Sequence, residues 1–312
     1  MIGPDPAFVF PGQGSQRPGM GRELAGCAPA ARELIDRAEQ LTGIAVGELM
    51  TRADEKTLAD PEAAQLTIFV WSSVLAAELA AAGCRPVAVA GHSLGEYAAL
   101  VAAGCLSWED ALAIVARRGR AMAAAARRQP GAMAAIAGLL EEQVTELCRQ
   151  FSAGPGIVVM ANLNAPRQVV VSGTSEEVCL VADAAQALGA LRVKRLPVGG
   201  AYHSPLMADA ERELAPLLAA ADLQAPRMPF VSSMTGGVVQ DIEKYRHQLL
   251  GGQITQPVRW ADTVAALART VPRTFIEVGP GRVLTGLGRN MVRAARHLAG
   301  CEALGSLAVG RS

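Results

Sequence analysis

The feature that most constrains the fold is the stretch 87–104, where a short apolar run precedes Gly91-His-Ser-Leu-Gly95 and a helix-forming segment. The run 87–90 is typical of a strand buried in a parallel sheet. Gly104 is placed to end the helix. A strand, a tight glycine turn and a helix in this order are the setting of a nucleophile elbow. Ser93 is therefore a candidate nucleophile, and the alternative is a plain strand-to-helix turn with an idle serine.

Composition narrows the class of protein. A chain of 312 residues allows about two domains, or one domain with an insertion. Lys+Arg 29 against Asp+Glu 29 gives no net charge, which argues against a nucleic-acid partner. Six scattered cysteines and four scattered histidines do not fit a zinc site and favour reduced thiols. The N-terminus lacks the basic region of a signal peptide, and the apolar segment 67–82 contains too many polar residues to predict a membrane span. We therefore expect a cytoplasmic protein.

The middle of the chain predicts an inserted subdomain. Between Pro130-Gly131 and Pro197, the pattern changes to short alternating elements. Their order, βαββαβ, is that of a ferredoxin-like unit. We therefore expect an α/β protein in which 1–129 and 198–312 form a large subdomain and 130–197 a small one. The predicted elements are strand 132–138, helix 141–151, strand 157–163, strand 168–173, helix 175–188 and strand 191–196.

Two further segments contain candidate anion-binding groups: the glycine-rich loop 11–16 and the helix that contains Arg118. The strand at 7–10 runs into a loop, 11–16, whose glycines would let backbone N–H groups approach an anion, although a plain connection fits equally well. In the helix predicted over 107–128, Arg118 lies on an apolar stripe. Burying an unpaired guanidinium is costly, so Arg118 must meet a carboxylate or an anionic ligand, or extend to the surface.

A nucleophilic serine needs a base. His203 follows a predicted strand and two glycines, a position at which α/β folds display functional groups. His92 is adjacent to the serine and would diverge from it, and His247 and His297 lie in arginine-flanked segments that we expect to be helical and solvated. No aspartate stands at an evident strand end, so the partner of His203 is an amide or a backbone carbonyl.

Taken together, six motifs resemble the acyltransferase family of fatty acid and polyketide synthesis, and most closely its malonyl-CoA:acyl carrier protein transacylases. They occur in the order of the family from about residue 7 to about residue 290, which is nearly the whole chain. The motifs are Phe10-Pro-Gly-Gln-Gly-Ser-Gln16, Gly91-His-Ser-Leu-Gly-Glu-Tyr97, Arg118-Gly119, Ala201-Tyr-His-Ser-Pro-Leu-Met207, Gln253 with Pro257-Val258-x-Trp260, and Glu277-Val-Gly-Pro-Gly-x-Val-Leu284.

The resemblance implies a role for each catalytic position. Ser93 is acylated, and His203 is its general base and acid. Gln253 takes the place of a carboxylate as the acceptor that orients His203. The backbone N–H groups of Gln13 and Leu94 form the oxyanion hole.

The resemblance also implies the substrate contacts and the fold. Arg118 pairs with the free carboxylate of the malonyl group, because a planar guanidinium grips a carboxylate through two parallel hydrogen bonds. Gln65 and Asn162 match polar residues that line the cleft of the family, and Tyr202 adds a hydroxyl near the pocket. The implied fold is an α/β-hydrolase-like core with a parallel sheet and the inserted ferredoxin-like subdomain. The implied protein is a monomer that needs no metal or cofactor and uses malonyl-CoA and the phosphopantetheine arm of an acyl carrier protein, without nucleic acid or membrane.

Three alternatives remain open at this point. Leu94 resembles malonyl-selective members, whereas Gly-Ala-Tyr-His, ending at His203, departs from both the malonyl and the methylmalonyl patterns, so methylmalonyl or ethylmalonyl units are possible substrates. An editing hydrolase would use the same serine but transfer the acyl group to water. A non-catalytic docking module would not require Ser93, His203, Arg118 and Gln253 together. The sequence does not distinguish fatty acid from polyketide assembly.

Overall fold

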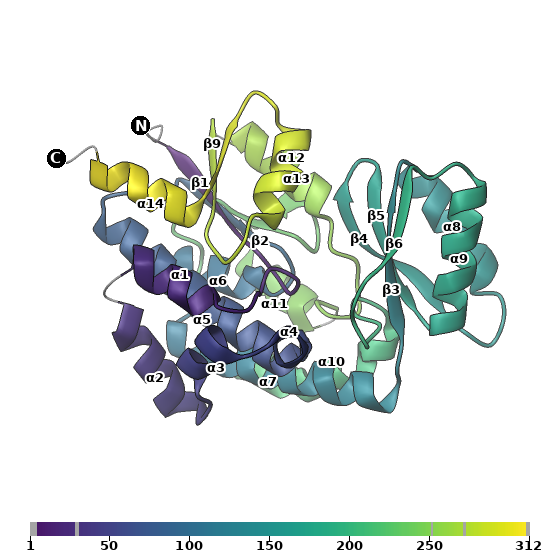
Figure 1. Cartoon of the computed structure of the whole chain (residues 1–312), viewed down its shortest axis with the longest axis horizontal. Helices are drawn as coiled ribbons and strands as arrows, with labels where there is room; N and C mark the ends of the chain where they lie inside the picture. Colours follow the sequence, from purple (N-terminus) through teal and green to yellow (C-terminus); the bar gives the residue numbers. More distant parts are fainter. Residues whose placement is uncertain (1–4, 29–30, 251, 271–272, 310–312) are drawn as a thin grey trace.

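The computed structural model describes residues 5–28, 31–250, 252–270 and 273–309. It is a mixed α/β fold with a mostly parallel six-stranded sheet and a separate four-stranded antiparallel sheet. Figure 1 shows the four-stranded sheet on the right of the molecule, with α8 (Glu141–Phe151) and α9 (Ser175–Ala187) on its outer side. The larger sheet and its helices form the rest of the molecule.

The six-stranded sheet has the order β10-β9-β1-β2-β7-β8, and all neighbours are parallel except β7 and β8. Every residue of β1 and β2 is buried, which explains their continuous apolar sequences. The carboxyl ends of β1, β2, β7 and β9 meet at one edge, where α/β sheets hold their sites. The strands are β1 (Pro6–Phe10), β2 (Ala88–Gly91), β7 (Phe230–Ser232), β8 (Gly237–Val238), β9 (Thr274–Glu277) and β10 (Arg296–Ala299).

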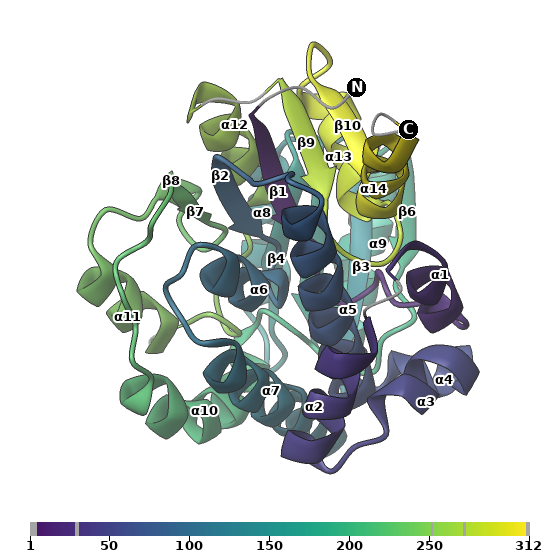
Figure 2. The ribbon, with the colours of Figure 1, turned by 90° about the vertical axis from the view of Figure 1, so that its left-hand side faces the viewer.

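Helices cover both faces of this sheet (Figure 2). Alternate residues of the strands divide between two cores: Phe8 and Val89 pack with α5 and α7, whereas Val9 and Ala90 pack with α12 and α13. The helices outside the small sheet are α1 (Met20–Cys27), α2 (Arg32–Thr42), α3 (Val46–Arg52), α4 (Glu55–Ala59), α5 (Pro61–Ala81), α6 (Gly95–Ala102), α7 (Trp108–Arg128), the 3-10 turn η2 (Pro205–Met207), α10 (Ala208–Ala220), α11 (Ile242–Leu250), α12 (Trp260–Thr270), α13 (Val283–Met291) and α14 (Gly300–Val309).

Helix α7 begins and ends as its sequence predicts. The N-cap Ser107 accepts the N–H of Asp110 at 3.0 Å, and two acidic residues lie in the first turn. Arg127 and Arg128 lie in the last turn, where cations interact favourably with the helix dipole. These two ends fix the stretch of helix that carries Arg118 into the core.

The small sheet confirms the predicted order of elements. Its strands are β3 (Ala132–Ala137), β4 (Val158–Ala165), β5 (Gln168–Gly173) and β6 (Arg192–Arg195), arranged as β4-β5-β3-β6. The segment leaves and rejoins the larger unit at one point, because Pro130 and Gly200 form an isolated antiparallel bridge. A second bridge joins Asn162 of β4 to Val258, so the small sheet contacts the segment before α12.

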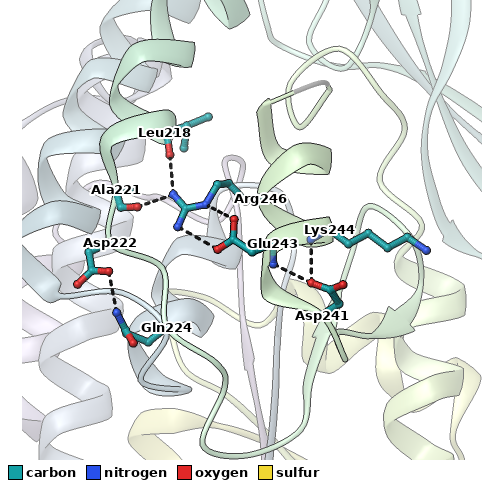
Figure 3. A network of polar contacts seen from close by, with 8 residues as sticks. All are labelled: Leu218, Ala221, Asp222, Gln224, Asp241, Glu243, Lys244 and Arg246. Atoms are coloured by element: carbon teal, nitrogen blue, oxygen red, sulfur yellow. Dashed lines mark hydrogen bonds and ion pairs between the residues drawn. The ribbon is translucent and has the colours of Figure 1, made fainter.

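Arg246 fastens α11 to the end of α10 (Figure 3). Its Nη1 donates to the carbonyl oxygens of Leu218 at 3.5 Å and Ala221 at 2.5 Å, at the C-terminal end of α10, where carbonyl groups lack partners within the helix. Its Nε is paired with Glu243 at 3.1 Å. The contact places the inner side of α11, including Tyr245, against the core.

Three expectations require correction. His297 is not in a solvated helix: it lies in β10, is buried, and stacks on Phe275 with ring centroids 5.0 Å apart. Helix α5 has the length and hydropathy of a membrane span despite its polar residues, and it is mostly buried as a core helix of this fold. Cys301 forms a disulfide, so the expectation of reduced thiols is wrong there. Cys84, Cys105, Cys148 and Cys179 are free, and the side chain of Cys27 lies outside the described part.

Candidate active site

The turn after β2 requires glycine on both sides of Ser93. A Cβ on Gly91 would lie 2.0 Å from the backbone carbon of Gly95, and a Cβ on Gly95 would lie 2.0 Å from the carbonyl oxygen of Phe10. Ser93 itself has a φ of 52°, a left-handed backbone conformation that residues other than glycine rarely adopt. Close packing of the turn against β1 therefore holds a serine in a strained position, as in a nucleophile elbow.

His203 is the residue that the fold brings to this serine. Its Nε2 lies 2.8 Å from Oγ of Ser93, although the two residues are 110 positions apart. Its Nδ1 lies 3.0 Å from the carbonyl oxygen of Gln256. Because a carbonyl only accepts hydrogen bonds, Nδ1 carries the proton and Nε2 presents its lone pair to the serine hydroxyl. The pair has the arrangement of a nucleophile and its general base.

The environment keeps this imidazole neutral. Burial, with smaller contributions from the charge of Arg118 and from His92, lowers the pKa of His203 to about 3. The residue also has a positive φ of 58°, and its N–H donates to the carbonyl oxygen of Ile254 at 3.1 Å. A neutral histidine held at both backbone and ring is ready to accept a proton.

The role predicted for Gln253 differs from its contacts. The acceptor that orients His203 is the backbone carbonyl of Gln256, one of the two options that the residues alone left open. Gln253 instead donates from Nε2 to the carbonyl oxygen of Ser93 at 2.9 Å and accepts from Nε of Arg118 at 3.1 Å.

Arg118 is buried at the centre of the site, with a side chain that is only 1% exposed. Its Nη1 donates to Oε1 of Gln65 at 2.6 Å, and its Nη2 donates to Oγ of Ser93 at 3.0 Å. The guanidinium also lies 5.8 Å from the ring centroid of Tyr97. No carboxylate forms an ion pair with it within the described residues, and burial lowers its pKa. A buried cation paired only with amides and a hydroxyl is suited to bind an anion.

Two backbone N–H groups after the ends of neighbouring strands remain available as donors. Those of Gln13 and Leu94 donate no hydrogen bond to any described residue, and each follows the end of a parallel strand. Leu94 is also the N-cap of α6, so its N–H points out of a helix N-terminus. This placement is consistent with an oxyanion hole above the serine.

The remaining predicted residues, Gln65, Tyr202 and Asn162, are all buried, but they differ in their polar contacts. Gln65 is fully buried, and its Nε2 lies 3.5 Å from Oε1 of Gln13, besides the contact with Arg118. Tyr202 is buried, and burial raises the pKa of its hydroxyl to about 12, an effect that the nearby side chain of Gln13 partly offsets. Asn162 is buried in β4, and its side chain has no hydrogen-bond partner in the described part of the chain.

Two residues of the quoted motifs stabilise the scaffold. Both carboxylate oxygens of Glu277 accept backbone N–H groups at the start of α13, from Leu284 at 3.0 Å and Thr285 at 2.7 Å. His92 points away from Ser93, as expected for adjacent residues in a turn, and its Nε2 lies 2.9 Å from Oδ1 of Asn164 in the small sheet. Sequence reasoning did not find this contact, since nothing local pairs β4 with the elbow.

The geometry supports covalent catalysis by a serine on an acyl group that carries a negative charge. Among the described residues, no group of three or more His, Cys, Asp or Glu side chains is placed to hold a metal ion. The sequence model of the acyl transferase domain matches residues 7–311. The chain belongs to the acyl transferase domain family.

Members of this family resemble the chain over its whole length. The malonyl CoA-acyl carrier protein transacylase of Bacillus subtilis is 38% identical over 293 residues, which cover 94% of this chain and 92% of that protein. The crystal structure of the malonyl-CoA:acyl carrier protein transacylase of Xanthomonas oryzae is 35% identical, with a TM-score of 0.91 and 99% of each chain covered. A malonyl-transacylase solved in complex with a type II polyketide acyl-carrier protein is 34% identical, with a TM-score of 0.90 over 96% of this chain and 98% of that one.

Proposed function

We propose that this acyltransferase moves a malonyl group from malonyl-CoA to the phosphopantetheine thiol of an acyl carrier protein. The observation that carries the proposal is the contact of Nη2 of the buried Arg118 with the hydroxyl of Ser93, which is itself hydrogen bonded to His203. An acyl group on this oxygen would lie beside a guanidinium that forms no ion pair with a carboxylate among the described residues. The relatives named above, one of them solved with a polyketide acyl-carrier protein, support the same substrate and partner.

The proposed reaction has two steps. Oγ of Ser93 attacks the thioester carbon while Nε2 of His203 takes the hydroxyl proton. The N–H groups of Gln13 and Leu94 stabilise the tetrahedral oxyanion, which collapses as the C–S bond breaks and His203 returns the proton to the CoA thiolate. In the second step, His203 removes the proton of the carrier thiol, the sulfur attacks the malonyl ester, and Ser93 recovers its hydroxyl.

Arg118 is the proposed determinant of acyl selection. Three of its five N–H groups are used by Gln253, Gln65 and Ser93, so two remain for the carboxylate of the malonyl group. Acetyl lacks this carboxylate and gains nothing from the guanidinium. Asn162 and Tyr202 are proposed to line the acyl pocket, and the hydroxyl of Tyr202 leaves a substituted malonyl unit as the alternative substrate.

An editing hydrolase is the second candidate, because it would form the same acyl-serine. The fate of the acyl group separates the two activities. Malonyl-loaded enzyme, freed of malonyl-CoA, is divided between buffer and buffer containing a phosphopantetheinylated carrier protein, and both proteins are weighed intact over time. Transfer predicts that the label appears on the carrier and is stable without it; rapid loss to water in both samples would identify a hydrolase. The carrier protein without its phosphopantetheine arm is the control.

We also propose how the chain is divided into subdomains, from the strand order and the position of the elbow. The parallel sheet with an elbow after β2 supports an α/β-hydrolase-like core, 1–129 and 198–312. The order β4-β5-β3-β6 supports a ferredoxin-like small subdomain, 130–197. We further propose that the enzyme acts in the cytoplasm as a monomer, with no cofactor of its own.

A further inference from the structure

Glu96 is a buried carboxyl that none of the roles described above uses. It lies in the first turn of α6, three residues after Ser93, and its side chain is 0% exposed. An acidic residue in a first turn interacts favourably with the helix dipole at the surface. The dipole does not account for full burial, which is costly for an acidic group. The neighbours of the carboxyl must therefore explain its position.

One neighbour leads to the backbone N–H of the serine. Oε1 of Glu96 accepts the N–H of Ser233 at 2.9 Å. Ser233 directly follows β7, the strand beside β2, and its Oγ accepts the N–H of Ser93 at 3.4 Å. Glu96 thus fixes the residue whose hydroxyl contacts the strained amide of the nucleophile.

A second neighbour leads to the carbonyl of the serine and to the guanidinium. The amide nitrogen of Gln253 has two hydrogens, and one of them goes to the carbonyl oxygen of Ser93. The same amide lies close enough to the Glu96 carboxyl to lower its pKa. With one hydrogen of its nitrogen on the carbonyl oxygen of Ser93, Gln253 has its oxygen toward Nε of Arg118.

One oxygen of the Glu96 carboxyl remains without a hydrogen-bond partner among the described residues. Its Oε2 and the hydroxyl of Tyr245 are both buried without a hydrogen-bond partner among the described residues, and burial together with the charge of Glu96 raises the pKa of Tyr245. Tyr245 is carried by α11, which Arg246 holds against α10 (Figure 3). Burial raises the pKa of Glu96 to about 7, and the charge of Glu96 in turn favours the charged form of Arg118. The carboxyl therefore acts on the site through position and through charge.

We propose that Glu96 is a positioning residue that sets the preference for malonyl over uncharged acyl groups by orienting Gln253 against Arg118. Its contact with Ser233 holds the nucleophile in the same arrangement. The inference rests on the proposed roles of Ser93 and Arg118. Loss of Glu96 should affect malonyl loading more than acetyl loading, because only an acyl group with a carboxylate needs the guanidinium in place.

The test replaces Glu96 by glutamine, which keeps the shape of the side chain and removes its charge and one acceptor oxygen. Loading from malonyl-CoA and from acetyl-CoA is measured on the intact protein, with kcat and KM for each. We expect the malonyl-to-acetyl ratio of kcat/KM to fall about tenfold in E96Q. Glu277→Gln is the matched control, since Glu277 is equally buried and accepts two backbone N–H groups without contact with Ser93 or Arg118. Its ratio should not change.

A double-mutant cycle with Gln253→Met tests whether Glu96 acts on Arg118 through Gln253. If Glu96 acts through Gln253, E96Q lowers the ratio in the wild type and has no further effect on it in the Q253M background. An unchanged ratio in folded E96Q, or additive effects in the double variant, would overturn the proposal. Should E96Q fail to fold, Q253M alone must lower the ratio, and an unchanged ratio again overturns it. Failure of the wild type to load malonyl would instead contradict the proposed function.

Discussion

Ser93 and His203 both adopt left-handed backbone conformations, and their side chains are joined by a 2.8 Å contact between Oγ and Nε2. Among the described residues, they are the two non-glycine positions with positive φ. Such conformations cost about 1 to 3 kcal/mol each and persist only where the surroundings impose them. The nucleophile and its base are thus both held by strained turns at the edge of the parallel sheet, which fixes the direction of each side chain.

The turn around Ser93 predicts a strong dependence on Gly95. The variant Gly95→Ala should lose about 3 kcal/mol or more of unfolding free energy, because the added Cβ meets the carbonyl oxygen of Phe10. Gly286→Ala is the control: this glycine lies in α13 with nothing within 4 Å of an added Cβ, and the change should stabilise the protein by about 0.5 to 1 kcal/mol. Urea unfolding measures both. Equal stability of the two variants would contradict the packing argument.

Replacing Arg118 should change acyl preference more than overall reactivity. Arg118→Ala removes the group proposed to bind the malonyl carboxylate, so malonyl loading from CoA should fall by at least about a hundredfold, while acetyl loading stays equal or rises. The measurement is the rate of acyl-enzyme formation with each thioester.

Arg118→Lys is the informative companion variant. It keeps the positive charge but not the planar fork, so its malonyl loading should lie between that of the wild type and that of R118A. The removal of Arg118 also leaves the oxygens of Gln65 and Gln253 without their donor, which predicts a lower melting temperature. A malonyl-to-acetyl ratio that both folded variants share with the wild type would refute the assignment.

The environment of His203 predicts an imidazole that does not titrate near neutral pH. Because burial lowers its pKa to about 3, the ring stays neutral throughout the range in which a free histidine takes up a proton. The Cε1–H resonance of this histidine, assigned by its absence in His203→Gln, should keep its chemical shift between pH 7.5 and pH 5. A transition near pH 6.5 would show an ordinary, solvated histidine.

The same shift predicts how stability changes with pH. Between the folded pKa and the unfolded value of 6.5, the unfolded chain binds the proton and the folded chain does not, so this histidine makes the protein less stable as the pH falls. From pH 7 to pH 5 the wild type should lose up to about 2 kcal/mol more unfolding free energy than His203→Gln. Urea unfolding at both pH values checks this; a smaller loss in the wild type would have the wrong sign.

Tyr202 provides the test of acyl size. In a competition among malonyl-, methylmalonyl-, ethylmalonyl- and acetyl-CoA, we expect malonyl to be loaded preferentially. Tyr202→Phe removes the hydroxyl beside Gln13 and should raise the share of methylmalonyl by up to about tenfold, since a pocket discriminates weakly against one extra carbon. An unchanged distribution would place the specificity of the pocket elsewhere.

The elbow and the elements of the small sheet could be predicted from local sequence patterns. Glycines flank Ser93 because no other residue fits there, and this constraint is written in adjacent positions. The alternation of strands and helices between 132 and 195 predicted each element of the small sheet to within two residues. By contrast, β10 is four residues long with arginine at its start, and its pairing with β9 comes from the core beneath it. Such a strand leaves no periodic signal.

The contacts across the site depend on tertiary structure. Arg118 on an apolar stripe indicated an anion site, but which amides it would contact depended on the packing of α5 and α7. The Nδ1 partner of His203 is a backbone carbonyl, which any residue at position 256 would supply. Glu96 lay within a quoted motif, yet a carboxyl in a first turn is ordinarily a surface feature. Its burial became evident only once β7 lay beside β2.

The mass of the intact protein after brief incubation with malonyl-CoA tests malonyl transfer through Ser93 most directly. A malonyl-serine intermediate predicts a gain of one malonyl group, carried by Ser93 in the peptide that contains the elbow, and no gain in Ser93→Ala. It predicts that a phosphopantetheinylated carrier protein then removes the label. A wild-type protein that gains no mass, or a Ser93→Ala variant that gains the same mass, would rule out a malonyl-serine intermediate.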